Sequence, residues 1–118
     1  MDRDHFRAVV LRTRDELASS LEPIRARLRE SLRDSSGELA LADQHPADVA
    51  TDTEMRELDV STEVLFEARL RQIDHALGRL DDGTYGTCIV CGQQIPVERL
   101  ELVPETPYCV KDAAKQNS

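Results

Sequence analysis

The chain has very little aromatic volume. Its 118 residues include no tryptophan, two phenylalanines and two tyrosines, so that aromatic side chains make up only 3% of the sequence. A thick globular core usually needs more ring volume than four such residues supply. Hydrophobic residues nevertheless account for 40% of the chain and charged residues for 32%, a mixture typical of long helices with thin apolar seams. We therefore predict a mainly α fold.

Long hydrophobic runs are also missing. No stretch approaches the ~18 apolar residues that a membrane-spanning helix needs, and the charged start of the chain lacks the apolar segment of a secretory signal. These absences predict a cytoplasmic protein without a membrane partner. Ser/His/Asp and Cys/His constellations and phosphate-binding loops are missing too, so the sequence does not predict an enzyme.

Positive charge is in deficit. The chain has 23 Asp and Glu against 15 Lys and Arg, a formal net charge of −8. Such a chain repels phosphate, which argues against direct DNA binding. One group of arginines at helical spacing is interpreted as a solvated face rather than a nucleic-acid stripe, and it consists of Arg25, Arg27, Arg29 and Arg33. The acidity instead fits docking on a basic protein surface or in a basic channel.

The first helical stretch covers residues 4–33. Its apolar residues mostly recur every three or four positions, and they are Phe6, Val10, Leu17, Leu21, Ile24, Leu28 and Leu32. Pro23 lies inside this stretch. Because proline lacks a backbone donor and clashes with the preceding turn, we expect a kink or a break near Ser19–Glu22.

The second helical stretch covers residues 53–82, after a predicted loop over 34–52 and a start at Thr51 or Asp52. Its seam steps by four and three residues and comprises Phe66, Leu70, Ile73, Leu77 and Leu80. A slightly rotated seam is expected before it, made of Met55, Leu58, Thr62 and Leu65. The two stretches together predict an antiparallel coiled-coil hairpin over residues 1–82, with its tip at about 38–50.

The remaining residues, 83–118, predict a small C-terminal module with a short last helix. Two closely spaced pairs stand out in it, Cys88-x-x-Cys91 and Cys109-x-x-Asp112. A structural zinc is usually held by four ligands in two such pairs, and thiolates favour this soft metal. We predict one zinc held by these four residues, although aspartate is an uncommon ligand in structural sites.

Two other interpretations of this module remain open. The finger could lack metal and keep its shape by packing its apolar residues, which are Ile89, Ile95, Leu100 and Val103. Alternatively, Cys88 and Cys91 could form a disulfide that acts as a redox switch. Water in place of Asp112 as the fourth ligand is a variant of the zinc interpretation.

The run GTYGTCIVCGQQIPVERLELVPETPYC closely resembles the zinc-finger end of the DksA/TraR family of bacterial transcription factors. The resemblance covers roughly residues 40–112 and includes the segment from His45 to Ala50, which is similar to a stress-associated branch. It implies a coiled-coil hairpin with a globular zinc end and a C-terminal helix. It also implies binding to RNA polymerase rather than DNA, with the hairpin in the secondary channel and an acidic tip near the active centre.

The resemblance also points to particular tip residues. The family's tip carries two aspartates three positions apart, followed by alanine. Asp48 and Ala50 match the second aspartate and the alanine, while His45 stands at the first position with Asp43 nearby as a possible substitute. A nucleotide alarmone is a further partner that the resemblance suggests. Arg69 and Arg71 are stand-ins for the family's polymerase-contacting basic residues.

Alternatives to this function also remain. Asp48 could simply cap a helix start. The same scaffold could serve as a stress-associated interaction protein, or as a redox or metal sensor, without acting on the polymerase directly.

Overall fold

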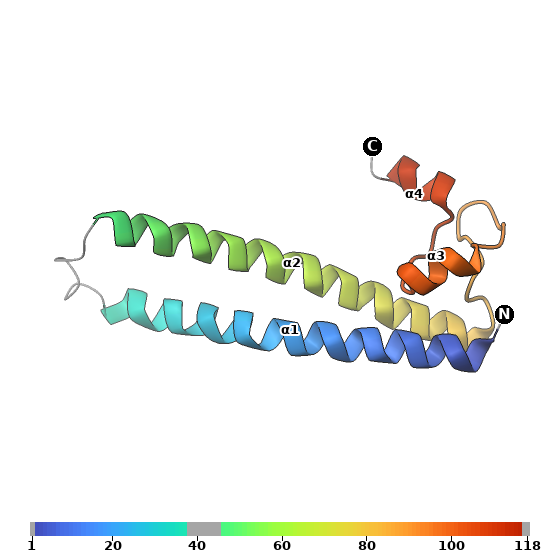
Figure 1. Cartoon of the computed structure of the whole chain (residues 1–118), viewed down its shortest axis with the longest axis horizontal. Helices are drawn as coiled ribbons and strands as arrows, with labels where there is room; N and C mark the ends of the chain where they lie inside the picture. Colours follow the sequence, from blue (N-terminus) through green and yellow to red (C-terminus); the bar gives the residue numbers. More distant parts are fainter. Residues whose placement is uncertain (1, 38–45, 117–118) are drawn as a thin grey trace. The chain divides into compact units, whose positions relative to one another are not determined.

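The computed structural model describes residues 2–37 and 46–116, with side chains for 2–33 and 53–116. Within these residues the chain forms four helices, α1 (Arg3–Gly37), α2 (Pro46–Asp82), α3 (Val97–Leu102) and α4 (Val110–Gln116), drawn in Figure 1. In the same residues the only strand-like pairing is an isolated antiparallel bridge between Thr87 and Gln94. The predicted mainly α fold is confirmed, and none of the described helices is apolar over a length that could cross a bilayer.

The chain divides into two compact units that cut across the long helices. Unit 1 comprises residues 1–16 and 68–118, and unit 2 comprises residues 17–67. The C-terminal module therefore forms one unit with the start of α1 and the end of α2. This division differs from the predicted boundary after residue 82, which stays a prediction.

Helix α1 continues through Pro23. It is a single helix from Arg3 to Gly37 with the proline inside it. Of the predicted kink or break near Ser19–Glu22, the break is therefore wrong and the kink stays a prediction. Proline costs one backbone hydrogen bond and crowds the preceding turn. Leu21 and Ile24 on either side of it are buried, and this burial of the flanking turns offsets the local cost.

Helix α2 begins earlier than predicted. Its first residue is Pro46, so the predicted start at Thr51 or Asp52 is wrong. Proline suits the first turn of a helix, because its missing N–H would have no partner within the helix and its φ is already helical. As a result, Asp48 and Ala50 lie in α2 rather than in a loop.

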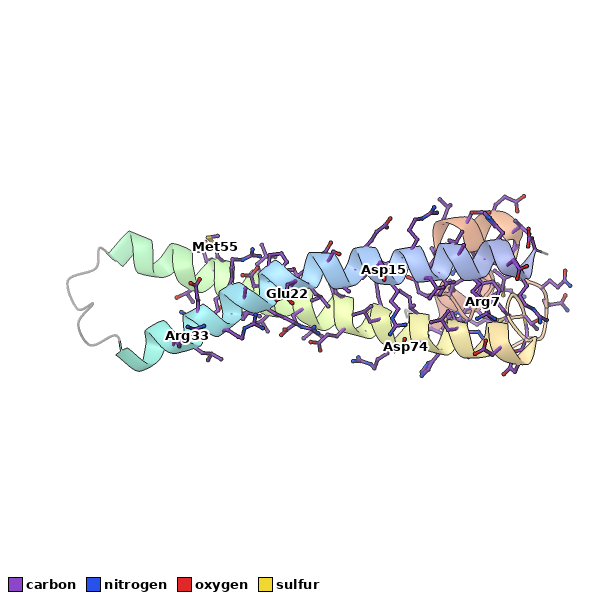
Figure 2. All side chains as sticks on the ribbon, turned by 90° about the horizontal axis from the view of Figure 1, so that it is seen from below. Arg7, Asp15, Glu22, Arg33, Met55 and Asp74 are labelled. Atoms are coloured by element: carbon purple, nitrogen blue, oxygen red, sulfur yellow. The ribbon has the colours of Figure 1, made fainter. Side chains whose placement is uncertain are left out.

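Unit 1 has the larger apolar core. Its two helical segments run antiparallel, since Arg7 pairs with Asp81 at 2.9 Å and Arg14 with Asp74 at 3.9 Å; Figure 2 labels Arg7 and Asp74. Most of the predicted seam lies between these segments. The buried core of this unit consists of Phe6, Val9, Val10, Ile73, Ala76, Leu80, Tyr85, Cys88, Ile95 and Leu100.

Ion pairs join the two helical segments of unit 2. Arg25 lies 3.5 Å from Glu63 and 3.1 Å from Glu67, and Arg27 binds both carboxylate oxygens of Asp59 at 2.9 Å. These pairs again run antiparallel, so the predicted pairing of the two helices is confirmed. They also occupy arginines of the group interpreted as a solvated face.

The predicted second seam in unit 2 is wrong. Met55, Leu58 and Leu65 are all exposed, and only Thr62 of that set is half-buried. The side of α2 that faces α1 carries Asp59, Glu63 and Glu67 here. Leu32, at the end of the predicted α1 seam, is exposed as well. In unit 2 the buried apolar side chains come from α1, namely Leu17, Leu21 and Ile24, whereas α2 contributes carboxylates that pair with arginines of α1.

Candidate metal centre

A left-handed glycine ends α2 and directs the chain into the C-terminal module. Gly83 has φ +84°, and the N–H of Thr84 donates to the carbonyl oxygen of Arg79 at 2.9 Å. This six-residue hydrogen bond is the Schellman arrangement, in which glycine is favoured because L side chains avoid positive φ. The turn places Tyr85 against the base of the two long helices.

Tyr85 fixes the module on the helices of unit 1. Its side chain is buried, its ring lies 5.7 Å from the ring of Phe6, and its hydroxyl donates to the carbonyl oxygen of Pro104 at 2.8 Å. Burial raises the pKa of this phenol to about 12. A tyrosine can thus contribute apolar area to a core and still satisfy its polar end.

We expect Tyr85 to remain protonated until pH about 12, roughly two units above the ordinary value for tyrosine. Because the pKa is raised in the folded state, its contribution to stability is complete below pH about 10 and is lost as the pH rises towards 12. Tyrosinate absorbance during alkaline titration measures this. The Tyr85→Phe variant identifies the late component, and titration of all tyrosine by pH 10 to 11 would contradict the expectation.

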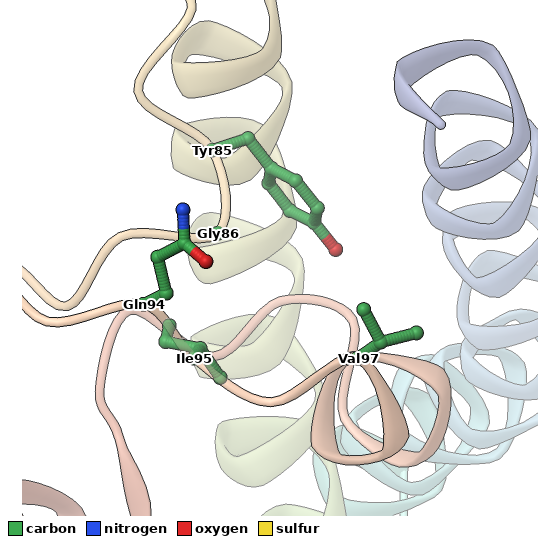
Figure 3. Close-up of a pocket in the computed structure, with 5 residues that line it drawn as sticks. All are labelled: Tyr85, Gly86, Gln94, Ile95 and Val97. Carbon is green, nitrogen blue, oxygen red and sulfur yellow. The ribbon is translucent and has the colours of Figure 1, made fainter. Parts of the chain in front are cut away.

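A shallow pocket lies beside Tyr85. It has a volume of about 130 Å³ and is lined by Tyr85, Gly86, Gln94, Ile95 and Val97, as Figure 3 shows. Pockets for small-molecule ligands usually measure about 300–1,000 Å³. The pocket is smaller than that and includes none of the four predicted metal ligands, so we assign it no role.

A tight backbone turn presents the first pair of cysteines. The N–H of Cys88 donates to the carbonyl oxygen of Gln93 at 2.8 Å, and the N–H of Gly92 donates to that of Cys88 at 3.0 Å. Gly92 has φ +74°, and a Cβ atom there would meet nothing within 4 Å. The backbone conformation, and not a lack of space, therefore favours glycine.

The second pair lies at the start of α4. Cys109 directly precedes this helix and accepts a hydrogen bond from the N–H of Ala113 at 2.9 Å. Asp112 lies in the first turn, three residues after Cys109. Residues three apart on a helix lie on the same face, so both side chains point to one side.

The structure brings all four predicted ligands together. One ligand atom from each of Cys88, Cys91, Cys109 and Asp112 lies within 4.8 Å of the others. Oδ2 of Asp112 lies 3.0 Å from Sγ of Cys88 and 3.2 Å from Sγ of Cys109, and the Sγ atoms of Cys91 and Cys109 are 3.8 Å apart. Cys88 and Asp112 are buried, whereas Cys91 is exposed.

The separation of the Cys91 and Cys109 sulfurs fits a tetrahedral metal site. Two thiolates about 2.3 Å from a zinc ion at the tetrahedral angle are roughly 3.8 Å apart, as are Cys91 and Cys109. The donor set is three sulfurs and one carboxylate oxygen. All three cysteines are free thiols, so the disulfide between Cys88 and Cys91 that the sequence left open is not formed here.

Hydrogen bonds between the thiols and the carboxylate order the cluster. Those from Cys88, Cys91 and Cys109 lower the pKa of Asp112 to about 2, and the bond to Asp112 raises the pKa of Cys91 to about 12. Burial raises the pKa of Cys88, but backbone N–H groups of neighbouring residues outweigh it, and the net direction is downward. Asp112 is thus ionised at neutral pH.

The module also has an apolar core of its own. Ile95 and Leu100 are buried and Val103 is half-buried, but Ile89 in the cysteine turn is exposed. Leu100 lies on α3, a helix that the sequence analysis missed. Its signal was Pro96, which directly precedes Val97 and is favoured at helix starts. The predicted short last helix is present as α4.

A buried carboxylate connects this module to α2. Glu105 is almost fully buried, and its Oε1 accepts hydrogen bonds from Arg69 at 2.9 Å, while its Oε2 has no hydrogen-bond partner. Arg79 donates to the backbone oxygen of Glu105 at 3.4 Å. Arg69 is therefore engaged within the chain. No local pattern indicates this pair, because its members are 36 residues apart in the chain.

We expect Arg69→Ala to destabilise unit 1 more than Glu105→Ala. The side chain of Glu105 is only 7% exposed and that of Arg69 is 45% exposed. Loss of the arginine leaves a buried charge unpaired, which costs about 2–3 kcal/mol, whereas an unpaired arginine here is solvated. Urea unfolding of both variants measures this. Arg27→Ala, which breaks an exposed pair, is the control, and equal effects of all three would contradict the expectation.

The structure does not describe the side chains of the predicted tip residues. Asp43 and His45 lie outside the described residues. The backbone of Asp48 and Ala50 belongs to α2, and their side chains lie outside the described part of the chain. Their predicted role stays a prediction. Arg71, the other predicted basic stand-in, is exposed on α2.

The family model of the prokaryotic dksA/traR C4-type zinc finger matches residues 83–111, which include Cys88, Cys91 and Cys109. The match ends one residue before Asp112. The C4 designation indicates four cysteine ligands. This chain differs from that pattern because Asp112 stands where the fourth cysteine is expected.

Known proteins resemble a larger part of the chain. General stress protein 16O of Bacillus subtilis (strain 168) is 41% identical over 86 residues, which are 72% of this chain and 53% of that protein. RNA polymerase-binding transcription factor DksA of Caulobacter vibrioides (strain NA1000 / CB15N) is 36% identical over 88 residues, 71% of this chain and 61% of that protein.

A solved structure is similar over almost the whole chain. The structure of transcription factor DksA2 from Pseudomonas aeruginosa matches with a TM-score of 0.75 and 31% sequence identity, covering 98% of this chain and 82% of that one. The chain spans between 30% and 61% of the length of the curated relatives it matches. Because the finger, the helix pair and the similarity to this structure agree, the chain belongs to the DksA/TraR family.

Proposed function

We propose that this protein binds RNA polymerase and regulates transcription. The observation that carries the proposal is its similarity to transcription factor DksA2 over 98% of this chain and 82% of that one. A relative with 36% identity is named as an RNA polymerase-binding transcription factor. Similarity along both helices and the finger supports a shared mode of action rather than a shared finger alone.

The charge of the chain supports binding to protein instead of DNA. The net charge is −8, which repels a phosphate backbone. Three arginines that could form a basic stripe, Arg25, Arg27 and Arg29, are held in ion pairs. Pairing with carboxylates uses the donors that would otherwise contact phosphate groups.

We infer that the action takes place in the secondary channel of the polymerase. The segment that includes Asp43, His45, Asp48 and Ala50 matches the family's tip pattern in part, and it follows α1 and includes the start of α2 in the sequence. Within this segment, Asp48 is the residue to which we assign the effect on the active centre. A carboxylate near a catalytic metal or a mobile loop perturbs it through a short-range electrostatic interaction.

The cysteine cluster is proposed as a structural zinc site. Cys88, Cys91, Cys109 and Asp112 would hold the ion, whose charge would offset half of the formal charge of three thiolates and a carboxylate. The four residues come from the turn after α2 and from the start of α4. Their joint ligation would therefore fix α4 on the cysteine turn. The site serves the shape of the module, and transcription regulation requires no chemistry there.

Co-purification with bacterial core RNA polymerase tests the proposed partner. The zinc-loaded full chain is expected to bind the purified core enzyme with a 1:1 ratio, and another secondary-channel factor is expected to displace it. A labelled promoter DNA fragment without polymerase is the control and should not bind. Failure of the chain to bind core enzyme would overturn the proposed partner. Binding that the competing factor leaves unchanged would overturn the proposed site in the secondary channel.

The comparisons do not favour the alternative of a scaffold without polymerase activity. We propose a nucleotide alarmone as an additional ligand, on the resemblance of this chain to the DksA/TraR family. The same co-purification, repeated with and without the nucleotide, measures its effect.

A further inference from the structure

One face of α2 in unit 2 carries an exposed apolar stripe. Met55, Leu58 and Leu65 are 56%, 67% and 64% exposed. At 3.6 residues per turn, these three positions fall within about 80° of the helix circumference. Figure 2 shows Met55 pointing away from α1. The ion pairs of Asp59, Glu63 and Glu67 lie on the neighbouring face, so the stripe takes no part in helix pairing.

The same unit carries nearly all of the net charge. Residues 17–67 include 12 of the 23 acidic side chains and 5 of the 15 basic ones, which gives −7 of the total of −8. Unit 1 is close to neutral. The apolar stripe is therefore embedded in the acidic part of the chain.

This combination of charges decides what can cover the stripe. A second copy of the chain would bring −7 against −7, and like charges in contact cost free energy. Nucleic acids and anionic membranes are excluded for the same reason. The partner must therefore be positively charged and must present apolar side chains to the stripe. A protein surface with basic residues around an apolar patch has both properties.

The size of the stripe indicates its share of such a contact. Three side chains cover much less than the ~800 Å² per partner of a standard protein interface. In many interfaces a few central apolar residues carry most of the binding energy, and a polar rim surrounds them. The stripe fits the centre of a contact whose rim is formed by the surrounding carboxylates.

We propose that Met55, Leu58 and Leu65 form the apolar centre of a docking surface that binds a basic region of RNA polymerase. The proposal rests on the proposed function for the identity of the partner. It assigns to the side of α2 a role that is separate from that of the tip. Binding energy comes from the stripe, and the acidic residues of unit 2 guide the approach.

The experiment compares two matched double variants of the full chain. Leu58→Gln with Leu65→Gln removes the stripe without changing the charge. Val60→Gln with Val64→Gln makes a similar change on a different face of the same helix, where the side chains are 46% and 59% exposed. Affinity for core RNA polymerase is measured by titration at low and high salt, and circular dichroism verifies that both variants keep their helices.

The leucine variant is expected to bind at least about tenfold more weakly, and the valine variant within about twofold of the unchanged protein. Affinity of all three should fall with salt, because the charge of unit 2 is the same. Equal binding by all three would overturn the assignment of the stripe and leave the proposed function intact. Absence of binding by the unchanged protein would overturn both.

Self-association is measured in the same samples by sedimentation. The unchanged protein is expected to be a monomer at the concentrations of the binding assay. A dimer that the leucine variant dissociates, while the valine variant keeps it, would assign the stripe to a second copy and overturn the proposal.

Discussion

Replacement of Asp112 by asparagine is expected to weaken zinc retention at least about tenfold, whereas cysteine at the same position is expected to strengthen it. Asp112 lies 3.0 Å and 3.2 Å from two of the cysteine sulfurs. Asparagine keeps the shape but removes the charge, and even the loss of partners outside the ligand set typically costs 10–100-fold in metal affinity. Cysteine supplies a softer donor and restores the C4 pattern of the family.

Zinc transfer to a competing chelator measures this prediction. The unchanged protein should contain about one zinc per chain, Asp112→Asn should release it faster, and Asp112→Cys should release it more slowly. Removal of the metal is expected to unfold the module, since the binding free energy of a structural zinc is also folding free energy. Identical release from all three proteins would show that Asp112 is not a ligand. A metal-free protein with unchanged folding would contradict the site itself.

Asp48→Asn is expected to abolish the effect on transcription and to leave polymerase binding nearly unchanged. The substitution removes a charge and keeps the size of the side chain. If the carboxylate acts electrostatically in the active centre, the chain should still enter the channel but no longer alter initiation there. The expected loss of regulation is at least about tenfold, the effect of about 1.4 kcal/mol of lost interaction.

In vitro transcription from a sensitive promoter, together with a binding titration, measures both parts. Asp52→Asn, which makes the same change four residues further along α2, is the control. His45→Asp is expected to increase the effect, because it restores the two aspartates that the family's tip carries. Equal activity of Asp48→Asn and the unchanged protein would remove this residue from the mechanism. A parallel loss of binding would place Asp48 in docking instead.

The Asp112→Asn and Asp48→Asn variants test two different parts of the proposed mechanism. Loss of zinc should act through folding of the C-terminal module, whereas loss of the Asp48 carboxylate should leave folding intact. The stripe variant, Leu58→Gln with Leu65→Gln, should affect affinity alone. Three different readouts therefore distinguish metal retention, activity and docking.

Features that depend on short spacing could be predicted from the sequence, and the structure brings the four side chains concerned within 4.8 Å of one another. Cys88 and Cys91 are separated by two residues, as are Cys109 and Asp112, and each spacing fixes a local geometry that a turn or one helical turn provides. The existence of the two long helices also followed from local periodicity. The two pairs were joined into one site because a structural zinc needs four ligands.

The positions at which helices begin and end could not be predicted from proline alone, because contacts with neighbouring residues can offset the free-energy cost of a proline. Pro23 was expected to kink or break α1, but the helix continues through it, and the burial of Leu21 and Ile24 beside it offsets the cost of the proline. Pro46 was placed in a loop, although its properties suit the first position of a helix. Proline alone indicates a local cost, and the surrounding contacts decide whether the helix continues.

By itself, the sequence determined the helical class, the acidic charge and the four side chains of the cysteine cluster, because composition and short spacing are local properties. Only the tertiary structure decided which apolar residues are buried. Met55, Leu58 and Leu65 have the spacing of a seam, yet they are exposed, because ion pairs occupy the face of α2 towards α1. The buried pair of Arg69 and Glu105 likewise joins residues far apart in the chain. Periodicity identifies an apolar face, and the partner that covers it depends on packing between distant segments.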